Sequence, residues 1–237
     1  MRRLTIAMSL LVAAVVFPAA VFSQRAYEPK FWVGADGGMT FSNMQFSPSV
    51  KQSMLGGKTL AFRMRYAEEK YFGLIGELIL EQRGWKEDFK EDKDKFNYSR
   101  TLTYLTLPVM THIYFGGSRV KGFVNLGPSV SYMLSDKISS NFDYENPVSV
   151  EGFPYHNREL AQLSMAVSSK FDYGISAGAG AEFFVGKNRR NSFSIEGRYY
   201  FGLGSIFPSH KTDRFSASRG TSISVTVGYW FRLLGNR

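Results

Sequence analysis

Apolar and polar residues alternate along the stretch from residue 174 to 185. Ile175, Ala177, Phe183 and Val185 fall on one face, whereas glycine, serine and Glu182 occupy the positions between them. A period of two predicts a β-strand, because successive side chains point to opposite faces. Similar patterns predict an all-β chain with eight strands, at about 31–41, 59–66, 72–85, 100–115, 122–134, 174–185, 192–203 and 221–231.

The gaps between these strands alternate in length. Long gaps fall at about 42–58, 86–99, 135–171 and 204–220, and short ones near 68–69, 117–118 and 188–189. Apolar outer faces, small or polar inner faces and unequal connections are typical of a transmembrane β-barrel. The sequence therefore predicts an eight-stranded antiparallel up-and-down transmembrane barrel with long extracellular loops and both termini in the periplasm.

Aromatic residues gather where the strands approach the predicted periplasmic rim. The groups are Phe31-Trp32, Tyr71-Phe72, Tyr114-Phe115, Phe183-Phe184 and Tyr229-Trp230-Phe231. Rings with one apolar and one polar side favour the membrane interface. A water-soluble β-sandwich is the alternative fold, but it leaves these rim aromatics unexplained.

The beginning of the chain has the features of a secretory signal. Arg2 and Arg3 precede an apolar stretch from Leu4 to Phe17, and small residues lead to Ser23. This stretch is shorter than the roughly 20 apolar residues of a spanning helix. We predict a signal peptide over 1–23, cleaved near Ser23, and one barrel domain over 24–237 in the bacterial outer membrane. Cysteine is absent, so neither disulfides nor thiolate metal sites are expected.

Several short motifs occur in order along most of the predicted barrel. They are ELILEQRG at 77–84, YLTLP at 104–108, GPSVS at 127–131, DYGI at 172–175 running into GAGAE at 178–182, and EGRYY at 196–200. In these motifs the chain resembles the PorT-like family of outer-membrane β-barrel proteins. The resemblance implies an eight-stranded barrel, and the family's namesake takes part in protein secretion across the outer membrane. Thr106 stands where the family motif implies an acidic residue, which predicts a rewired interior charge network there.

Charged side chains on the inward faces are nearly balanced in sign. They are Asp36, Arg63, Arg65, Glu77, Glu81, Arg83, Glu182, Glu196 and Arg198. An eight-stranded barrel is just wide enough for side chains to fill it, and buried charges are normally paired. We therefore predict a packed ion network; an ion or proton path is the alternative.

One pairing follows from an assumed hairpin register. If Gly186 faces Ser192, Glu182 lies opposite Glu196. Ionising both of two adjacent carboxylates is energetically unfavourable, so we expect Arg198 or an arginine from another strand to lie between them.

Nothing in the sequence predicts a catalytic, cofactor or metal site. His112, His156 and His210 are scattered and show neither metal-ligand spacing nor the pattern of a triad. The net charge of +9 favours contact with outer membrane lipid and lipopolysaccharide rather than nucleic acid in an exported chain.

The gap over about 135–171 is the longest, and loops of this length are usually functional or disordered. It contains apolar rings that a solvated spacer would not need: Phe142, Tyr144, Phe153 and Tyr155. We therefore expect a non-enzymatic barrel whose extracellular loops, this one above all, form a recognition surface. One alternative is an accessory subunit of an outer-membrane secretion machine, docked to a larger translocon through its wall or periplasmic turns. The other is a lipid-modifying enzyme.

Overall fold

The structure, a computed structural model, describes residues 29–67, 69, 71–89, 95–154, 156, 158–209 and 213–235. The predicted signal peptide lies outside these residues. The strands are β1 (Lys30–Ser47), β2 (Gln52–Ser53), β3 (Leu55–Ala67), β4 (Phe72–Glu87), β5 (Tyr98–Gly116), β6 (Val120–Ser140), β7 (Phe171–Val185), β8 (Asn191–Gly202) and β9 (Ala217–Leu234). Two short helices, η3 (Pro147–Ser149) and α2 (Ala161–Ser164), lie between β6 and β7. Among the residues that the structure describes, no helix is long and apolar enough to cross a membrane.

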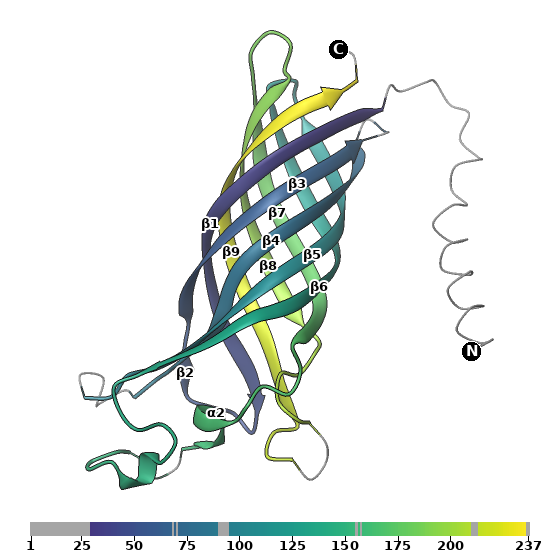
Figure 1. Cartoon of the computed structure of the whole chain (residues 1–237). Coiled ribbons are helices and arrows are strands. Elements are labelled where there is room, and N and C mark those ends of the chain that lie inside the picture. The colour runs from purple at the N-terminus through teal and green to yellow at the C-terminus, as the bar shows by residue number, and fades with distance from the viewer. Residues whose placement is uncertain are drawn as a thin grey trace, which may run out of the picture.

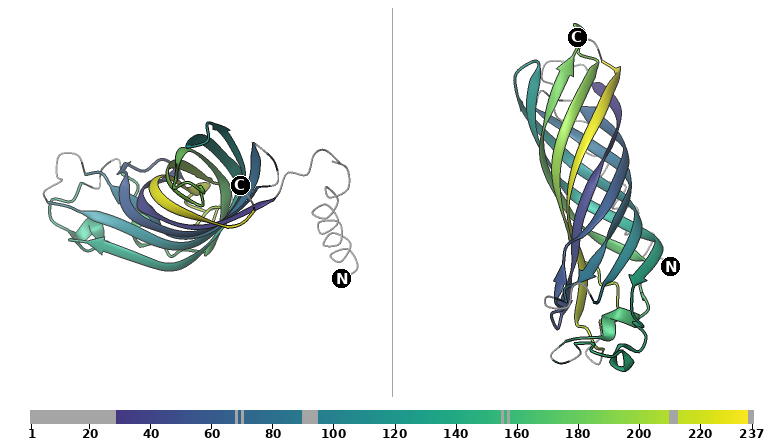
Figure 2. Two further views of the ribbon diagram at one scale, coloured as in Figure 1. Left: turned by 90° about the horizontal axis from the view of Figure 1, so that it is seen from above. Right: turned by 90° about the vertical axis from the view of Figure 1, so that its left-hand side faces the viewer.

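Eight of the strands close into a ring, as Figure 1 and the end-on view of Figure 2 show. Each long strand pairs antiparallel with its neighbours along the chain, and the ladder between β1 and β9 joins the last strand to the first. The two-residue β2 adds to β4 beyond the end of β3. The predicted eight-stranded up-and-down barrel is confirmed, and the sandwich is excluded because closure leaves no second sheet.

The two ends of the barrel differ. At the turn end, β1 begins, β9 ends and the connections are short, whereas the loop end carries the long connection that holds η3 and α2 (Figure 1). All of the long strands except β8 continue further toward the loop end than predicted, so the longest connection is 141–170 and the others shrink to 48–54, 88–97 and 203–216. The cause is backbone pairing that persists past the apolar belt: Thr103 and Ser135 still pair, although their side chains lack the apolar alternation used to predict strands.

The outer wall is an apolar belt. Large hydrophobic side chains are exposed on the outward face of every long strand, among them Met39, Leu60, Phe62, Leu74, Leu80, Leu107, Val109, Leu126, Val130, Ile175, Phe193, Ile195, Val225 and Val227. A contiguous apolar surface of this extent would be unstable in water, but it is the outer face expected of a barrel in lipid. The predicted outward and inward faces agree with the observed burial.

Glycines on the inward face of β7 make room for bulky neighbours. A Cβ atom on Gly178 would collide with the carboxylate of Glu196, and one on Gly180 would collide with the ring of Phe123. The absence of side chains on β7 therefore lets groups from β6 and β8 occupy the narrow lumen.

Candidate functional site

The charged interior is arranged in layers along the barrel axis. All nine side chains predicted to point inward lie in the lumen. They form one layer around Arg65 near the turn end, a central layer around Arg63, and one around Arg83 toward the loop end. A hydrophobic cap covers the last of these.

The central layer joins five charged side chains from four strands. The guanidinium of Arg63, only 1% exposed, lies 2.8 Å from Asp36, 2.7 Å from Glu77 and 2.6 Å from Glu196. Arg198 contacts the other oxygens of Glu77 at 2.6 Å and Glu196 at 2.9 Å. Each of the three carboxylates thus has at least one arginine, which is what burial of charge requires.

Near the turn end, Arg65 is held by a carboxylate and two aromatic rings. Its two terminal nitrogens bind both oxygens of Glu182, at 2.7 and 2.9 Å. Its guanidinium lies 4.8 Å from the ring centroid of Trp32 and 4.7 Å from that of Trp230. Bidentate pairing combined with cation–π contact fixes the arginine rigidly across the lumen.

Toward the loop end, Arg83 is stacked between tyrosines. Its guanidinium lies 4.2 Å from the ring centroid of Tyr104 and 4.3 Å from that of Tyr200. Glu81 and Asp172 each approach it at 3.5 Å, and the Tyr200 hydroxyl donates to Asp172 at 2.9 Å. Between this layer and the central one lies a cavity of about 20 Å³, which has room for a single water.

The register predicted for the β7–β8 hairpin is wrong. Glu182 pairs with Ser194, and Glu196 pairs with Gly180, which precedes Glu182 by two residues in β7. Val185 pairs with Asn191 across connection 186–190. This closing pair lies one residue earlier on each strand than the assumed pair of Gly186 and Ser192. The two glutamates therefore lie in different layers, Arg65 binding Glu182 and Arg63 with Arg198 binding Glu196.

Thr106 is part of the charge network. Its hydroxyl donates to Glu81 at 2.7 Å and lies 2.9 Å from the Ser131 hydroxyl. An acidic side chain here would place a second carboxylate against Glu81. In this chain a neutral donor stabilises Glu81 instead, so the network differs from the one that the family motif implies.

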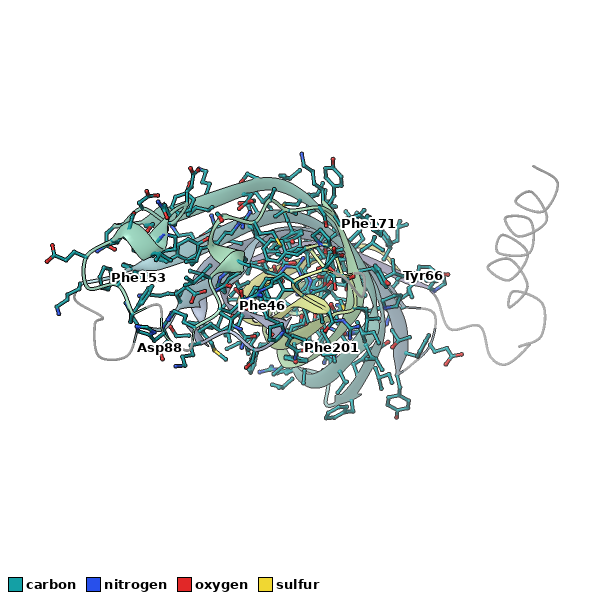
Figure 3. The ribbon with its side chains drawn as sticks, turned by 90° about the horizontal axis from the view of Figure 1, so that it is seen from below. Phe46, Tyr66, Asp88, Phe153, Phe171 and Phe201 are labelled. Carbon is teal, nitrogen blue, oxygen red and sulfur yellow. The ribbon has the colours of Figure 1, made fainter. Side chains whose placement is uncertain are left out.

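The cap at the loop end has two parts. The mouth plug consists of Phe46, Trp85, Phe207 and Phe215, whose rings pack at centroid distances of 5.2 to 6.2 Å. The side cap consists of Phe89, Phe96, Phe142 and Phe153, with distances of 5.0 to 5.9 Å. Figure 3, viewed from the loop end, places Phe46 within the ring of strands and Phe153 to one side of it.

Polar contacts tie loop 141–170 to the barrel. Arg158 pairs with Glu87 at 3.0 Å, and Gln162 donates to the same carboxylate at 3.0 Å. Arg214 reaches Glu159 from loop 203–216 at 2.8 Å. Burial raises the pKa of Glu159, but hydrogen bonds from Arg214 and from the backbone amides of Leu160 and Ala161 outweigh this and hold the pKa below its usual value.

The loop rings expected to anchor a partner pack against one another. Phe153 is only 4% exposed, and Phe142 and Tyr144 are partly buried against the same cluster. Tyr155 lies outside the described residues. The loop rings are buried because the end of connection 88–97 supplies Phe96 and the start of β5 supplies Tyr98, and the loop rings cover these two apolar side chains. The described rings thus form the scaffold of the loop.

The rim aromatics do not all lie at the membrane interface. Phe72, Phe115, Phe183 and Tyr229 are exposed on the outer wall, but Trp32, Tyr114 and Trp230 are buried in the lumen. Neighbouring residues in a strand point to opposite faces, so an aromatic pair within a strand divides between lipid and interior. Tyr71 precedes β4, and both it and Phe72 are exposed.

Sequence reasoning missed part of the interior. Asp172 shares the inward face of Gly174 and Ser176 but was not among the predicted inward charges, because the predicted strand began at residue 174 whereas β7 begins at Phe171. Asn125 donates to Glu196 at 3.0 Å, but it is uncharged and so was not part of the predicted charge network. Strand parity alone could have placed Trp32 and Trp230 on the inward face.

His112 is a buried interior residue. Its Nδ1 lies 2.7 Å from Asn125 Oδ1, and its Nε2 lies 3.4 Å from a terminal nitrogen of Arg65. Within the described part of the chain, no cluster of three or more histidine, aspartate or glutamate side chains is placed to hold a metal ion.

Comparison with known proteins is consistent with this architecture. Residues 22–208 match the sequence model of a family described as the outer membrane protein beta-barrel domain. No curated protein matches the chain.

Among solved structures, OprG of Pseudomonas aeruginosa is 10% identical, with 89% of this chain and 99% of OprG covered and a TM-score of 0.51. Neisserial surface protein A is 12% identical, covering 86% and 97%, with a TM-score of 0.47. Ail of Yersinia pestis is 13% identical, covering 84% and 98%, with a TM-score of 0.40. The similarity to OprG supports the barrel fold and nothing further.

Proposed function

The chain belongs to the outer membrane protein beta-barrel domain family, and from this premise we propose that it is a non-enzymatic, non-conducting barrel whose extracellular loops form a recognition surface. Membership places it in the bacterial outer membrane. Within the family we assign it to the PorT-like group, on the motifs given above.

The observation that carries this proposal is that side chains block the lumen. Three charged layers cross the interior, and the mouth plug covers the layer around Arg83. An eight-stranded barrel has little space beyond its side chains. Interactions with partners are then left to the two ends and the outer wall.

Orientation assigns the cap to the cell exterior. Bacterial barrels have short periplasmic turns and longer extracellular loops. The turn end therefore faces the periplasm, and loop 141–170 faces outward. Lys137, Lys170 and Arg219 are exposed at the loop end, and we propose that they bind lipopolysaccharide phosphates.

The recognition surface lies on the solvent side of the cap. Packing of Phe142 and Phe153 within the side cap holds the segment around η3 in place. On that segment Val148 is 58% exposed, and Glu145 and Glu151 beside it are also exposed. An exposed apolar side chain flanked by carboxylates on a rigid support is suited to binding a partner with basic and apolar groups.

The second candidate is the accessory subunit of an outer-membrane secretion machine, which the PorT-like resemblance suggests. The turn end favours it in one respect, since exposed Arg119, Lys187, Arg189 and Arg190 present positive charge to the periplasm. An acidic surface of a larger translocon could dock there.

Site-specific photo-crosslinking on intact cells separates the two functions. A photoreactive amino acid at position 148 should give a discrete adduct, because Val148 lies on the proposed recognition surface. The same amino acid at position 118, in the exposed turn at the opposite end, is the matched control. An adduct from position 118 without one from 148 would contradict loop recognition and support the secretion role.

A further inference from the structure

A second, larger cavity opens within the barrel at the turn end. Its volume is about 400 Å³, which falls in the range of small-molecule sites. The exposed turn residues Ser118, Lys187 and Arg189 form its rim, and the buried Arg65–Glu182 pair lies at its inner limit. We call this cavity the vestibule.

The vestibule is strongly basic. Its described lining contains one carboxylate, Glu182, which already binds both terminal nitrogens of Arg65. Against it stand six basic side chains, Lys30, Arg65, Lys121, Lys187, Arg189 and Arg232. A concave site lined by one sign of charge within walls of low dielectric constant focuses the electrostatic field and concentrates ions of the opposite sign.

Its walls are aromatic as well as basic. Trp32 and Phe184 meet edge to face at 5.7 Å, and Tyr114 lies on the lining beside them. Lys121 Nζ lies 4.3 Å from the ring centroid of Tyr114, and the Arg232 guanidinium lies 5.4 Å from that of Trp32. Cations are therefore held against apolar surfaces, so an anion bound by them would have rings beside it.

We propose that the vestibule binds a carboxylate or phosphate group carried on an apolar or aromatic body, entering from the periplasm. The anion would pair with Lys121 and the basic rim, and the apolar body would pack on Trp32, Tyr114 and Phe184. This site lies at the opposite end from the proposed recognition surface and does not depend on it.

Calorimetric titration in a neutral maltoside detergent at low ionic strength tests the proposal. The probes are phenyl phosphate, N-acetylphenylalanine and N-acetylphenylalanine amide, which lacks the charge. An anion that binds should have a dissociation constant at least about tenfold lower than that of the amide, a difference in binding free energy of about 1.4 kcal/mol. A tighter phenyl phosphate indicates a phosphate-bearing natural ligand, and a tighter N-acetylphenylalanine indicates a peptide carboxylate; either result supports the site.

Charge reversal locates the binding. Lys187→Glu with Arg189→Glu changes two exposed rim residues and should weaken anion binding at least about tenfold. The matched control is Arg119→Glu with Arg190→Glu, which makes the same charge change at the same end but outside the lining, and it should have a much smaller effect. Folding of both variants is checked by their heat-dependent shift in gel mobility. Equal affinity for acid and amide, or equal weakening by both variants, would overturn the proposal.

Discussion

Replacing Arg63 by alanine should lower the free energy of unfolding by about 3–5 kcal/mol, the cost of breaking a buried ion pair by removing one partner. Arg63 contacts Asp36, Glu77 and Glu196, and nearly all of this layer is shielded from solvent. Asp36 would lose its only arginine in the described network. The effect is measured as a lower temperature for the change in gel mobility and a lower midpoint in denaturant.

Two further variants make this prediction specific. Arg198→Ala should cost less, because Arg63 still holds Glu77 and Glu196 and Asn125 still donates to Glu196. Arg219→Ala removes an exposed arginine at the loop end and should change the midpoint little. If Arg63→Ala unfolded under the same conditions as Arg219→Ala, the central layer would be hydrated rather than a closed ion network.

Replacing Phe153 by alanine should destabilise the side cap by about 3–5 kcal/mol, as for other buried aromatic residues. The ring lies 5.2 Å from Phe96 and 5.0 Å from Phe142, and the remaining rings would be left around a void. Loop 141–170 should then open locally while the barrel stays folded. Proteolysis of the loop in detergent should accelerate by at least about 100-fold, because cleavage follows the population of the open form.

Val148→Ala is the control for the side cap. It truncates an apolar residue in the same loop, but one that is largely exposed. Its cleavage rate should stay close to that of the wild type. Equal rates for Phe153→Ala and Val148→Ala would mean that the rings of the loop do not hold it closed.

The fold could be predicted from the sequence because strand parity is a local property. The face on which Leu78 or Glu77 lies follows from the apolar or polar character of its immediate neighbours. The apolar belt repeats this alternation on every long strand. Strand ends were less predictable. Beyond the belt the β5–β6 hairpin carries mostly polar residues, such as Ser99, Thr103 and Ser135, so the apolar alternation ends before the pairing does.

The interior partners could be predicted only as a set. Arg63 and Glu196 are 133 residues apart, and their contact depends on the combined register of several ladders. A single misplaced hairpin moved Glu182 and Glu196 into the same layer in the prediction. The vestibule was missed for a related reason: Lys30, Lys121, Lys187 and Arg232 come from four separate segments, and only barrel closure brings them together.

The central claim is that side chains close this barrel to ions, and the most direct test is conductance in a planar lipid bilayer. The refolded wild-type protein, added to a bilayer in concentrated potassium chloride, should give no discrete current steps, because three charged layers and the mouth plug block the lumen between the vestibule and the loop end. A porin inserted under the same conditions shows that the assay detects open barrels. Reproducible ohmic steps from the wild-type protein would contradict the account.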